Sequence, residues 1–216
     1  MNLSWRAAPF GELVDQVTAA GPDGGPAVVA VNGHSSSGKT TLAGRLAATL
    51  PDAAVLHTDD LAWHHGVFSW DELLRDDVLP TVRAGEPLDY RPPQWRARGR
   101  TDSITLPGGL AFLFVEGVGA SQASLRPEYD LVIWVETEEP TRFARDRIRL
   151  AAGEMGEDDF ASWMAEEYAY TTRERPWEHA DLLVYGGESI PYNRETEVVV
   201  ADWSGRAGDH RAAERL

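Results

Sequence analysis

The residues with the clearest chemical meaning in this sequence form a phosphate-binding loop, or Walker A motif. Residues 33–40 have the pattern G-x-x-x-x-G-K-T, and a second threonine follows. The glycines permit turns in which successive N–H groups point at phosphate oxygens. In such a loop the lysine ammonium binds the β- and γ-phosphates, and the hydroxyl of the first threonine binds Mg²⁺. The predicted nucleotide-binding residues are Gly33, His34, Ser35, Ser36, Ser37, Gly38, Lys39, Thr40 and Thr41.

Lys39 is the only lysine in the chain, whose other basic residues are all arginines. A sequence that otherwise uses arginine therefore has a compact, mobile point charge at this one position. The alternative to a binding loop is a glycine–serine turn without a ligand. The unique lysine favours the binding of a nucleoside triphosphate, with ATP or GTP as the donor.

The flanking sequence predicts the elements that position this loop. The β-branched run 27–31 indicates a buried strand, and apolar residues every four positions over 42–50 indicate a helix that Pro51 ends. Further strands are expected at 53–57, 111–115, 131–135 and 182–185. Strands that alternate with helices indicate an α/β fold with a doubly wound, five-stranded parallel sheet. A further strand is expected over 198–200.

Carboxylates follow two of the predicted strands. Asp59 and Asp60 come after 53–57, and Glu116 comes after 111–115. Ligands of open parallel sheets lie beyond the carboxyl ends of the strands. Asp59 is therefore expected to meet the γ-phosphate or an acceptor hydroxyl, and Glu116 to hold Mg²⁺ with Thr40. The alternatives are a helix cap for either aspartate, with Asp60 also a candidate for the metal, and a plain strand-end acid for Glu116.

Two aromatic segments are candidates for binding an acceptor. Residues 63–70, which include His64, either stack on a ring or cover the core. Residues 88–100 form a basic, aromatic segment in an acidic chain, and we expect its two prolines to prevent a helix. This segment is either a solvated loop or an acceptor-binding loop that contributes Tyr90, Trp95 and Arg96.

Arginines recur on one face of the helix predicted after Pro140. Arg142, Arg145 and Arg149 have the spacing i, i+3 and i+7. Such a stripe suits a lid that clamps a transferring phosphoryl group, with Arg142 and Arg145 as catalytic residues. The alternative is a solvated helix with ion pairs to neighbouring acids.

Composition limits the classes of partner. The 216 residues carry a formal charge of −15, which disfavours a nucleic-acid partner. There is no cysteine, and no apolar run approaches a membrane span, so a cytoplasmic protein without a membrane partner is expected. We predict a single domain over residues 1–203 and a polar tail over 204–216. The sequence leaves open whether the chain forms a homodimer.

These motifs together resemble the uridine kinase family, which belongs with phosphoribulokinase and nicotinamide riboside kinase to the P-loop kinases. The resemblance covers roughly residues 27–186. It implies that Asp59, after Leu56-His57-Thr58, is the catalytic base and that Glu116, at the end of 113–117, serves the Mg²⁺ site. Residues 87–90 look like the acceptor segment, and Arg142-Phe143-Ala144-Arg145 is similar to the lid motif. Two departures are the aromatic pair displaced to Trp63 and Asp146 in place of a lid arginine.

The function expected from the residues and the resemblance is an ATP- and Mg²⁺-dependent kinase that phosphorylates a hydroxyl of a small, nucleoside-like acceptor. A GTPase is disfavoured because its guanine-reading motif needs a second lysine. An ATP-binding regulator or scaffold that has lost phosphotransfer remains as the alternative.

Overall fold

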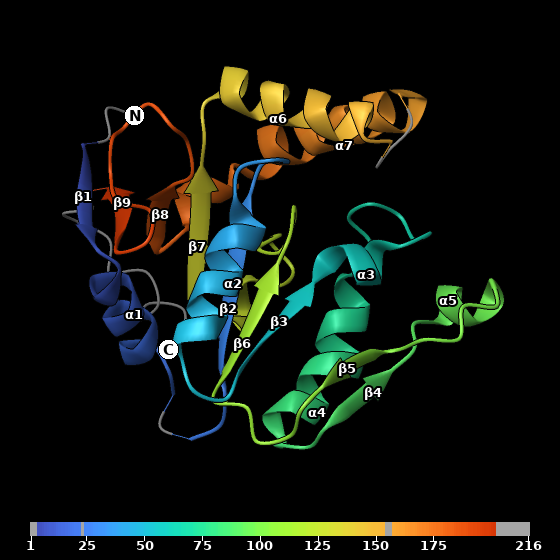
Figure 1. Ribbon diagram of the computed structural model, residues 1–216. Coiled ribbons are helices and arrows are strands. Elements are labelled where there is room, and N and C mark those ends of the chain that lie inside the picture. Colours follow the sequence, from blue (N-terminus) through green and yellow to red (C-terminus); the bar gives the residue numbers. More distant parts are fainter. Residues whose placement is uncertain (1–3, 23, 154–156, 202–216) are drawn as a thin grey trace.

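The computed structural model describes residues 4–22, 24–153 and 157–201, and its centre is a seven-stranded sheet (Figure 1). Five neighbouring strands are parallel, and the two at one edge are antiparallel. In spatial order the strands are β1 (Trp5–Pro9), β9 (Glu197–Ala201), β8 (Leu182–Tyr185), β7 (Leu131–Glu136), β2 (Ala27–Gly33), β6 (Phe112–Glu116) and β3 (Ala53–His57).

The parallel part of the sheet contains the five strands expected from the sequence, but the expected total of five is wrong. The strand expected at 198–200 is present as β9, which returns antiparallel to β8, and β1 pairs with β9. In β1 only Ala8 is buried, so the segment carries no apolar alternation that would mark it as a strand. Its pairing with β9 decides its conformation.

Both faces of the sheet are covered, which is why β2 is buried along its whole length. Val29 and Val31 point to the face covered by α1 (Phe10–Ala19) and α2 (Lys39–Thr49). Val28 and Ala30 point to the opposite face, where η1 (Leu73–Val78) and α4 (Leu79–Arg83) pack. The period of two along the strand thus divides the core into two layers, which confirms the doubly wound arrangement.

A long arm extends from the body after α4 (Figure 1). It consists of β4 (Leu88–Tyr90), α5 (Pro93–Ala97) and β5 (Ile104–Leu106), with β4 antiparallel to β5. The expectation that the two prolines prevent a helix is wrong. Pro93 begins α5, where its missing N–H has no partner to lose and its fixed φ suits the first helical turn.

Two helices lie across the carboxyl ends of the parallel strands (Figure 1). They are α6 (Glu139–Ala151), which is the expected arginine helix, and α7 (Glu157–Glu174). The remaining short elements are α3 (Thr58–Ala62), η2 (Arg126–Glu128) and η3 (Pro176–His179). The predicted tail 204–216 lies outside the described residues, and the single domain over 1–203 stays a prediction. Within the described ranges, no helix has the length and apolarity to cross a membrane.

Close packing of Gly186 after β8 against the phosphate loop generates a stability prediction. A Cβ at Gly186 would lie 2.0 Å from the backbone oxygen of Ser37. Because this oxygen belongs to the backbone, it cannot move away without distorting the phosphate loop. We expect Gly186→Ala to destabilise the protein by about 1–3 kcal/mol, measured by chemical denaturation. The matched control is Gly44→Ala in α2, where a Cβ meets nothing within 4 Å and removal of glycine stabilises by about 0.5–1 kcal/mol. Equal stability of the two variants would contradict the packing argument.

Candidate functional site

The phosphate loop joins β2 to α2 and needs glycine at both ends. Gly38 has φ +100° where α2 begins, a conformation that side chains other than glycine rarely adopt. A Cβ at Gly33 would lie 2.5 Å from the backbone oxygen of Val135 and 2.7 Å from Ser37 Oγ. The two glycines therefore let the loop turn tightly against β7 and enter the helix.

Lys39, the first residue of α2, is almost fully buried beneath this loop. Its ammonium donates a hydrogen bond to the backbone oxygen of His34 at 2.7 Å. Burial lowers the pKa of Lys39, while Glu116, Glu167 and Asp59 oppose that shift because their negative charges favour the ammonium. A desolvated ammonium that neighbouring acids only partly neutralise is suited to bind a phosphate.

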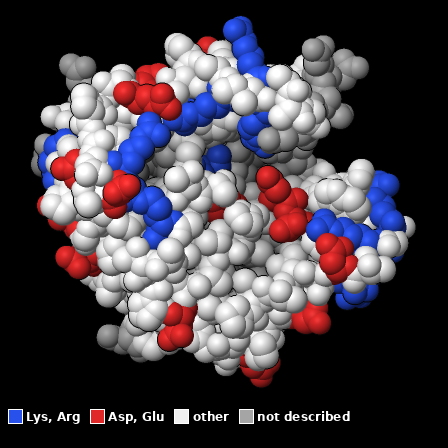
Figure 2. Space-filling view, in the orientation of Figure 1, with Lys and Arg blue, Asp and Glu red and all other residues white. Residues whose placement is uncertain are grey.

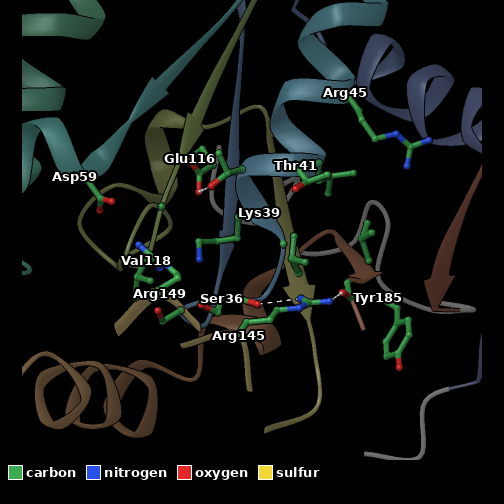
Figure 3. Close-up of a pocket in the computed structure, with 18 of the residues that line it drawn as sticks. Ser36, Lys39, Thr41, Arg45, Asp59, Glu116, Val118, Arg145, Arg149 and Tyr185 are labelled. Atoms are coloured by element: carbon green, nitrogen blue, oxygen red, sulfur yellow. Dashed lines mark hydrogen bonds between the residues drawn. The ribbon is translucent and has the colours of Figure 1, made fainter. Parts of the chain in front are cut away.

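A cavity of about 790 Å³ opens beside the loop, and Figure 2 shows it as a hollow between basic side chains on one rim and acidic side chains on the other. From the loop, the lining residues are Ser35, Ser36, Gly38, Lys39, Thr40 and Thr41. In Figure 3, Lys39 lies between Asp59 on one side and Arg145 and Tyr185 on the other. The cavity thus has two ends, one beside Asp59 and one beside Tyr185, with the phosphate loop between them.

The two expected carboxylates both line this cavity. Glu116 is buried, accepts a hydrogen bond from Thr40 Oγ1 at 3.2 Å, and pairs through its other oxygen with His57 Nδ1 at 2.7 Å. Asp59 lines the cavity from the first turn of α3, where its side chain is exposed to the cavity. Desolvation by the surrounding protein raises the pKa of Asp59 above its ordinary 3.8, although Lys39 partly offsets the shift.

The donor set fits Mg²⁺, since Thr40 and Glu116 bring two hard oxygen ligands within 3.2 Å of each other. Among the described residues there is no group of three His, Asp or Glu side chains that could hold a metal by themselves. A magnesium ion here would complete its shell with phosphate oxygens and water, as Mg²⁺ commonly does in nucleotide sites.

The arginines of α6 separate into two roles. Arg145 and Arg149 line the cavity, and Arg145 donates to the backbone oxygens of Ser36 and Gly186, each at 3.0 Å. Arg142 does not line the cavity, so its catalytic role stays a prediction that this position does not support. It is buried, donates to the backbone oxygen of Thr137 at 3.2 Å, and lies 4.0 Å from Glu167. The helical spacing predicted one face, but the first arginine of that face packs against the body.

Two buried acids, absent from the sequence prediction of the site, fasten α6 and α7 to the phosphate loop. Asp146 of α6 accepts a hydrogen bond from Ser36 Oγ at 2.5 Å. Glu167 of α7 pairs with His34 Nδ1 at 2.6 Å and accepts from the backbone N–H of Ser35 at 3.2 Å. Asp146 stands where the family pattern has a second lid arginine, and this departure was the signal available in the sequence.

Three of the nine predicted loop residues contribute to the loop's conformation without lining the cavity. The His34 side chain is turned to Glu167 and lies 5.2 Å from Trp134, measured between ring centroids. Ser37 is fully buried, and its backbone oxygen accepts a hydrogen bond from Thr137. Gly33 packs against β7. The side chains of His34 and Ser37 are therefore not expected to contact a nucleotide.

None of the four predicted acceptor-binding residues lines the cavity. Trp95 is 1 % exposed and its indole N–H donates to the backbone oxygen of Asp60 at 2.9 Å, so it anchors the arm. Tyr90 donates to Asp77 at 2.6 Å. His64 and Arg96 point into solvent. The structure instead brings Trp63 and Trp163 to the cavity, and sequence reasoning missed Trp163 because α7 is far away in the chain.

Comparison with solved structures defines the fold. A possible uridine kinase from Bacillus stearothermophilus is 24 % identical with a TM-score of 0.51, over 81 % of this chain and 98 % of that chain. A candidate fructose transport system kinase from Silicibacter sp. TM1040 is 21 % identical with a TM-score of 0.46, over 80 % and 95 % of the two chains. The chain has a P-loop kinase fold. No protein-family model and no curated protein matches the sequence.

The P-loop kinase fold explains the position of the site, since the loop, Asp59 and Glu116 all lie at the carboxyl ends of adjacent parallel strands. Because the identity is low, the likeness carries the fold alone.

The contacts of Glu167 generate a pH-dependent prediction. Burial alone would raise the pKa of Glu167, but the hydrogen bond to His34, the charges of His34 and Lys39 and the Ser35 N–H outweigh it and lower the pKa below 4.5. A carboxylate whose pKa falls on folding stabilises the protein above pH 4.5, and this contribution disappears as the pH falls through the folded-state pKa. We expect Glu167→Gln to cost about 1–3 kcal/mol at pH 7.

Urea denaturation at several pH values measures this effect. The difference between the parent protein and Glu167→Gln is expected to shrink below pH 4.5. Glu166→Gln is the control, because Glu166 is exposed on the same helix. A deficit that stays constant from pH 7 to pH 3 would contradict the electrostatic origin.

Proposed function

We propose that this protein is an ATP-dependent kinase that transfers the γ-phosphoryl group to a hydroxyl of a small, nucleoside-like acceptor. The observation that carries the proposal is that Lys39 of the phosphate loop and the Asp59 carboxylate line one cavity, with Arg145 and Arg149 along its rim. A phosphate-binding group and a candidate base beside one space are what phosphoryl transfer to an alcohol requires.

In the proposed step, the acceptor oxygen attacks the γ-phosphorus while its proton passes to Asp59. The bond between the γ-phosphorus and the β,γ-bridging oxygen breaks, and ADP leaves with that oxygen. The raised pKa of Asp59 makes its carboxylate a stronger base than an ordinary aspartate, and a positioned base contributes roughly 10²–10⁴ in rate. Lys39 and the rim arginines stabilise the charge on the phosphoryl oxygens.

Thr40 and Glu116 would hold Mg²⁺ against the triphosphate. When bound, the ion would neutralise charge on the β- and γ-phosphate oxygens. The hydrogen bond between His57 and Glu116 fixes one carboxylate oxygen and leaves the other directed at Thr40. The chain's own contribution is thus a pre-oriented pair of oxygen ligands.

The end of the cavity beside Tyr185 suits the base and ribose of the donor. The lining of the cavity includes Arg45, Tyr185, Tyr192, Arg194 and Val198. Aromatic and guanidinium groups can stack on either face of a purine, so these residues support a purine nucleotide and leave the choice between ATP and GTP to experiment.

The first test is ADP release from Mg²⁺-ATP across a panel of nucleosides, ribosides and sugars, with Lys39→Ala as control.

A compound that raises ADP release well above the basal rate would support the kinase. Tight ATP binding without any response to an acceptor would favour an ATP-binding regulator instead. The Lys39→Ala protein is expected to bind triphosphate weakly and to release no ADP, because it loses the only ammonium in the loop.

Replacement of Asp59 separates binding from chemistry. We expect Asp59→Asn to retain ATP affinity while kcat falls by about 10²–10⁴, because an amide cannot accept the proton. In the parent protein, kcat/KM should decline as the pH falls through the raised pKa of Asp59, since the protonated carboxyl no longer accepts a proton. Full activity of Asp59→Asn would remove Asp59 from the role of base.

Replacement of Arg149 tests the rim arginines. Arg149 lies close enough to Lys39 and Asp59 to lower the pKa of both. We expect Arg149→Ala to reduce kcat by about 10²-fold, the usual loss for one group that stabilises transition-state charge. Arg147→Ala is the control, because Arg147 is exposed on the same helix and does not line the cavity. Equal kinetics for the two variants would exclude a role for Arg149 in transfer.

A further inference from the structure

A single buried amide lies between the segments that form the candidate site. Asn32, the last residue but one of β2, is fully buried and directly precedes the phosphate loop. It does not line the cavity. A polar side chain inside the core needs hydrogen-bond partners, and these partners indicate its role.

Asn32 uses its full hydrogen-bonding capacity. Its oxygen accepts from the backbone N–H of Gly33 at 2.8 Å and from that of Gly119 at 3.1 Å. Its nitrogen donates to Ser121 Oγ at 2.6 Å and to the Tyr170 hydroxyl at 3.0 Å. The two N–H partners fix the orientation of the amide, because a flipped amide would turn its own N–H groups toward them. A buried network in which every group is satisfied is rigid.

Gly33 connects the amide to the phosphate-binding lysine. A Cβ at Gly33 would lie 3.3 Å from Lys39 Cγ, so the first residue of the loop packs directly against the lysine side chain. The same Cβ would lie 2.5 Å from the backbone oxygen of Val135, so Gly33 is also in contact with β7. The position of Gly33 therefore helps to determine where the ammonium meets a triphosphate.

Gly119 connects the amide to the candidate base. The turn over residues 117–121 follows β6, and Gly117 of this turn lines the cavity. A Cβ at Gly117 would lie 1.7 Å from Thr58 Oγ1, so the turn packs against the residue that precedes Asp59. The position of the turn therefore helps to determine where the Asp59 carboxylate lies.

Aromatic packing supports this turn from α7. The ring of Tyr170 stacks on that of Phe68, with 4.4 Å between centroids. Phe68 in turn packs against Gly119, where a Cβ would lie 2.7 Å from its ring. Because Tyr170 is fully buried and also binds the Asn32 amide, the turn is held by hydrogen bonds and by ring packing together.

We propose that Asn32 is a positioning residue that sets the distance between the phosphate held by Lys39 and the Asp59 carboxylate. The inference rests on the proposed kinase function and adds to it a residue outside the cavity. One oxygen atom accepts from both Gly33 and Gly119, so a shift of either segment changes the position of the other. Phosphoryl transfer is sensitive to such shifts, since a displacement of about 1 Å can lower a rate about 10²-fold.

Kinetics of variants at position 32 test the inference on the full chain. Asn32→Ala removes all four hydrogen bonds, and Asn32→Leu does so while it keeps a side chain branched at Cγ. With Mg²⁺-ATP and uridine, or the fastest compound of the panel above where uridine is inactive, we expect both variants to lower kcat by about 10²-fold. The KM for ATP is expected to stay within about threefold, because Lys39 and the loop N–H groups remain. A parent-like kcat in either folded variant would overturn the inference.

Asn32→Asp is the conservative variant. Its carboxylate can accept from both N–H groups, and the hydroxyls of Ser121 and Tyr170 can turn to donate to it. We expect kcat within about 10-fold of the parent's and a higher KM for ATP, because the added negative charge lies beside the loop. A kcat lower than the parent's by about 10²-fold in folded Asn32→Asp would overturn the inference, even where Asn32→Ala and Asn32→Leu do not fold.

Tyr170→Phe separates positioning from stability. It keeps the ring stack on Phe68 and both N–H groups on the Asn32 oxygen, and it removes one hydrogen bond that Asn32 donates. We expect a lower melting temperature with the parent's kcat. A kcat reduced as far as in Asn32→Ala would show that any loss of stability lowers the rate, which would overturn the inference.

Hydrogen exchange measured by mass spectrometry distinguishes the failure of this inference from the failure of the kinase proposal. We expect faster exchange over residues 31–36 and 117–121 together in Asn32→Ala or Asn32→Leu than in the parent. Faster exchange in both segments, in a protein whose parent turns over no acceptor, would keep the coupling and reject phosphotransfer. Parent-like exchange in either segment would overturn the inference and leave the kinase intact.

Discussion

A phosphate loop exposes many backbone N–H and carbonyl groups and has little apolar surface of its own, so other parts of the chain must hold it by hydrogen bonds. The first of these partners is Asn32 in β2, whose side-chain oxygen accepts from the N–H groups of Gly33 and Gly119. Its amide donates to Ser121 and Tyr170. One buried side chain therefore couples the start of the loop to the turn after β6 and to α7.

The remaining partners come from the helices that lie over the loop. Asp146, Arg145 and Glu167 together engage residues 34–36 through side-chain and backbone atoms. Ser36 has φ +55°, an uncommon conformation for a residue other than glycine, and both Asp146 and Arg145 contact it. Helix α6, which the sequence predicts as a lid, and helix α7 are thus structural supports of the phosphate loop.

These supports determine the electrostatics of the cavity. The buried carboxylates of Asp146 and Glu167 lie beside the loop, and their negative charge disfavours the binding of a triphosphate. The positive charges of the arginines on α6 offset this effect. Because Lys39 is desolvated and Arg145 is already directed at the loop, the positive groups are oriented before a ligand arrives. Preorganised charge of this kind loses little free energy to reorganisation during transfer.

The sequence alone was sufficient to predict the loop, the strands around it and the two strand-end acids, because each depends on local pattern: glycine spacing, β-branched runs and a carboxylate after a strand. Lys39, Thr40, Asp59 and Glu116 line the cavity as their positions along the chain indicated. The seven-stranded total could not be predicted, since β1 has one buried residue and depends on β9 for its form.

Trp95 and Arg142 could not be separated from true lining residues by type or spacing. Their burial is decided by contacts with Asp60, Thr137 and Glu167, which are distant in sequence or on other elements. Local pattern thus determined which groups carry chemistry, and tertiary packing decided which of them face the cavity.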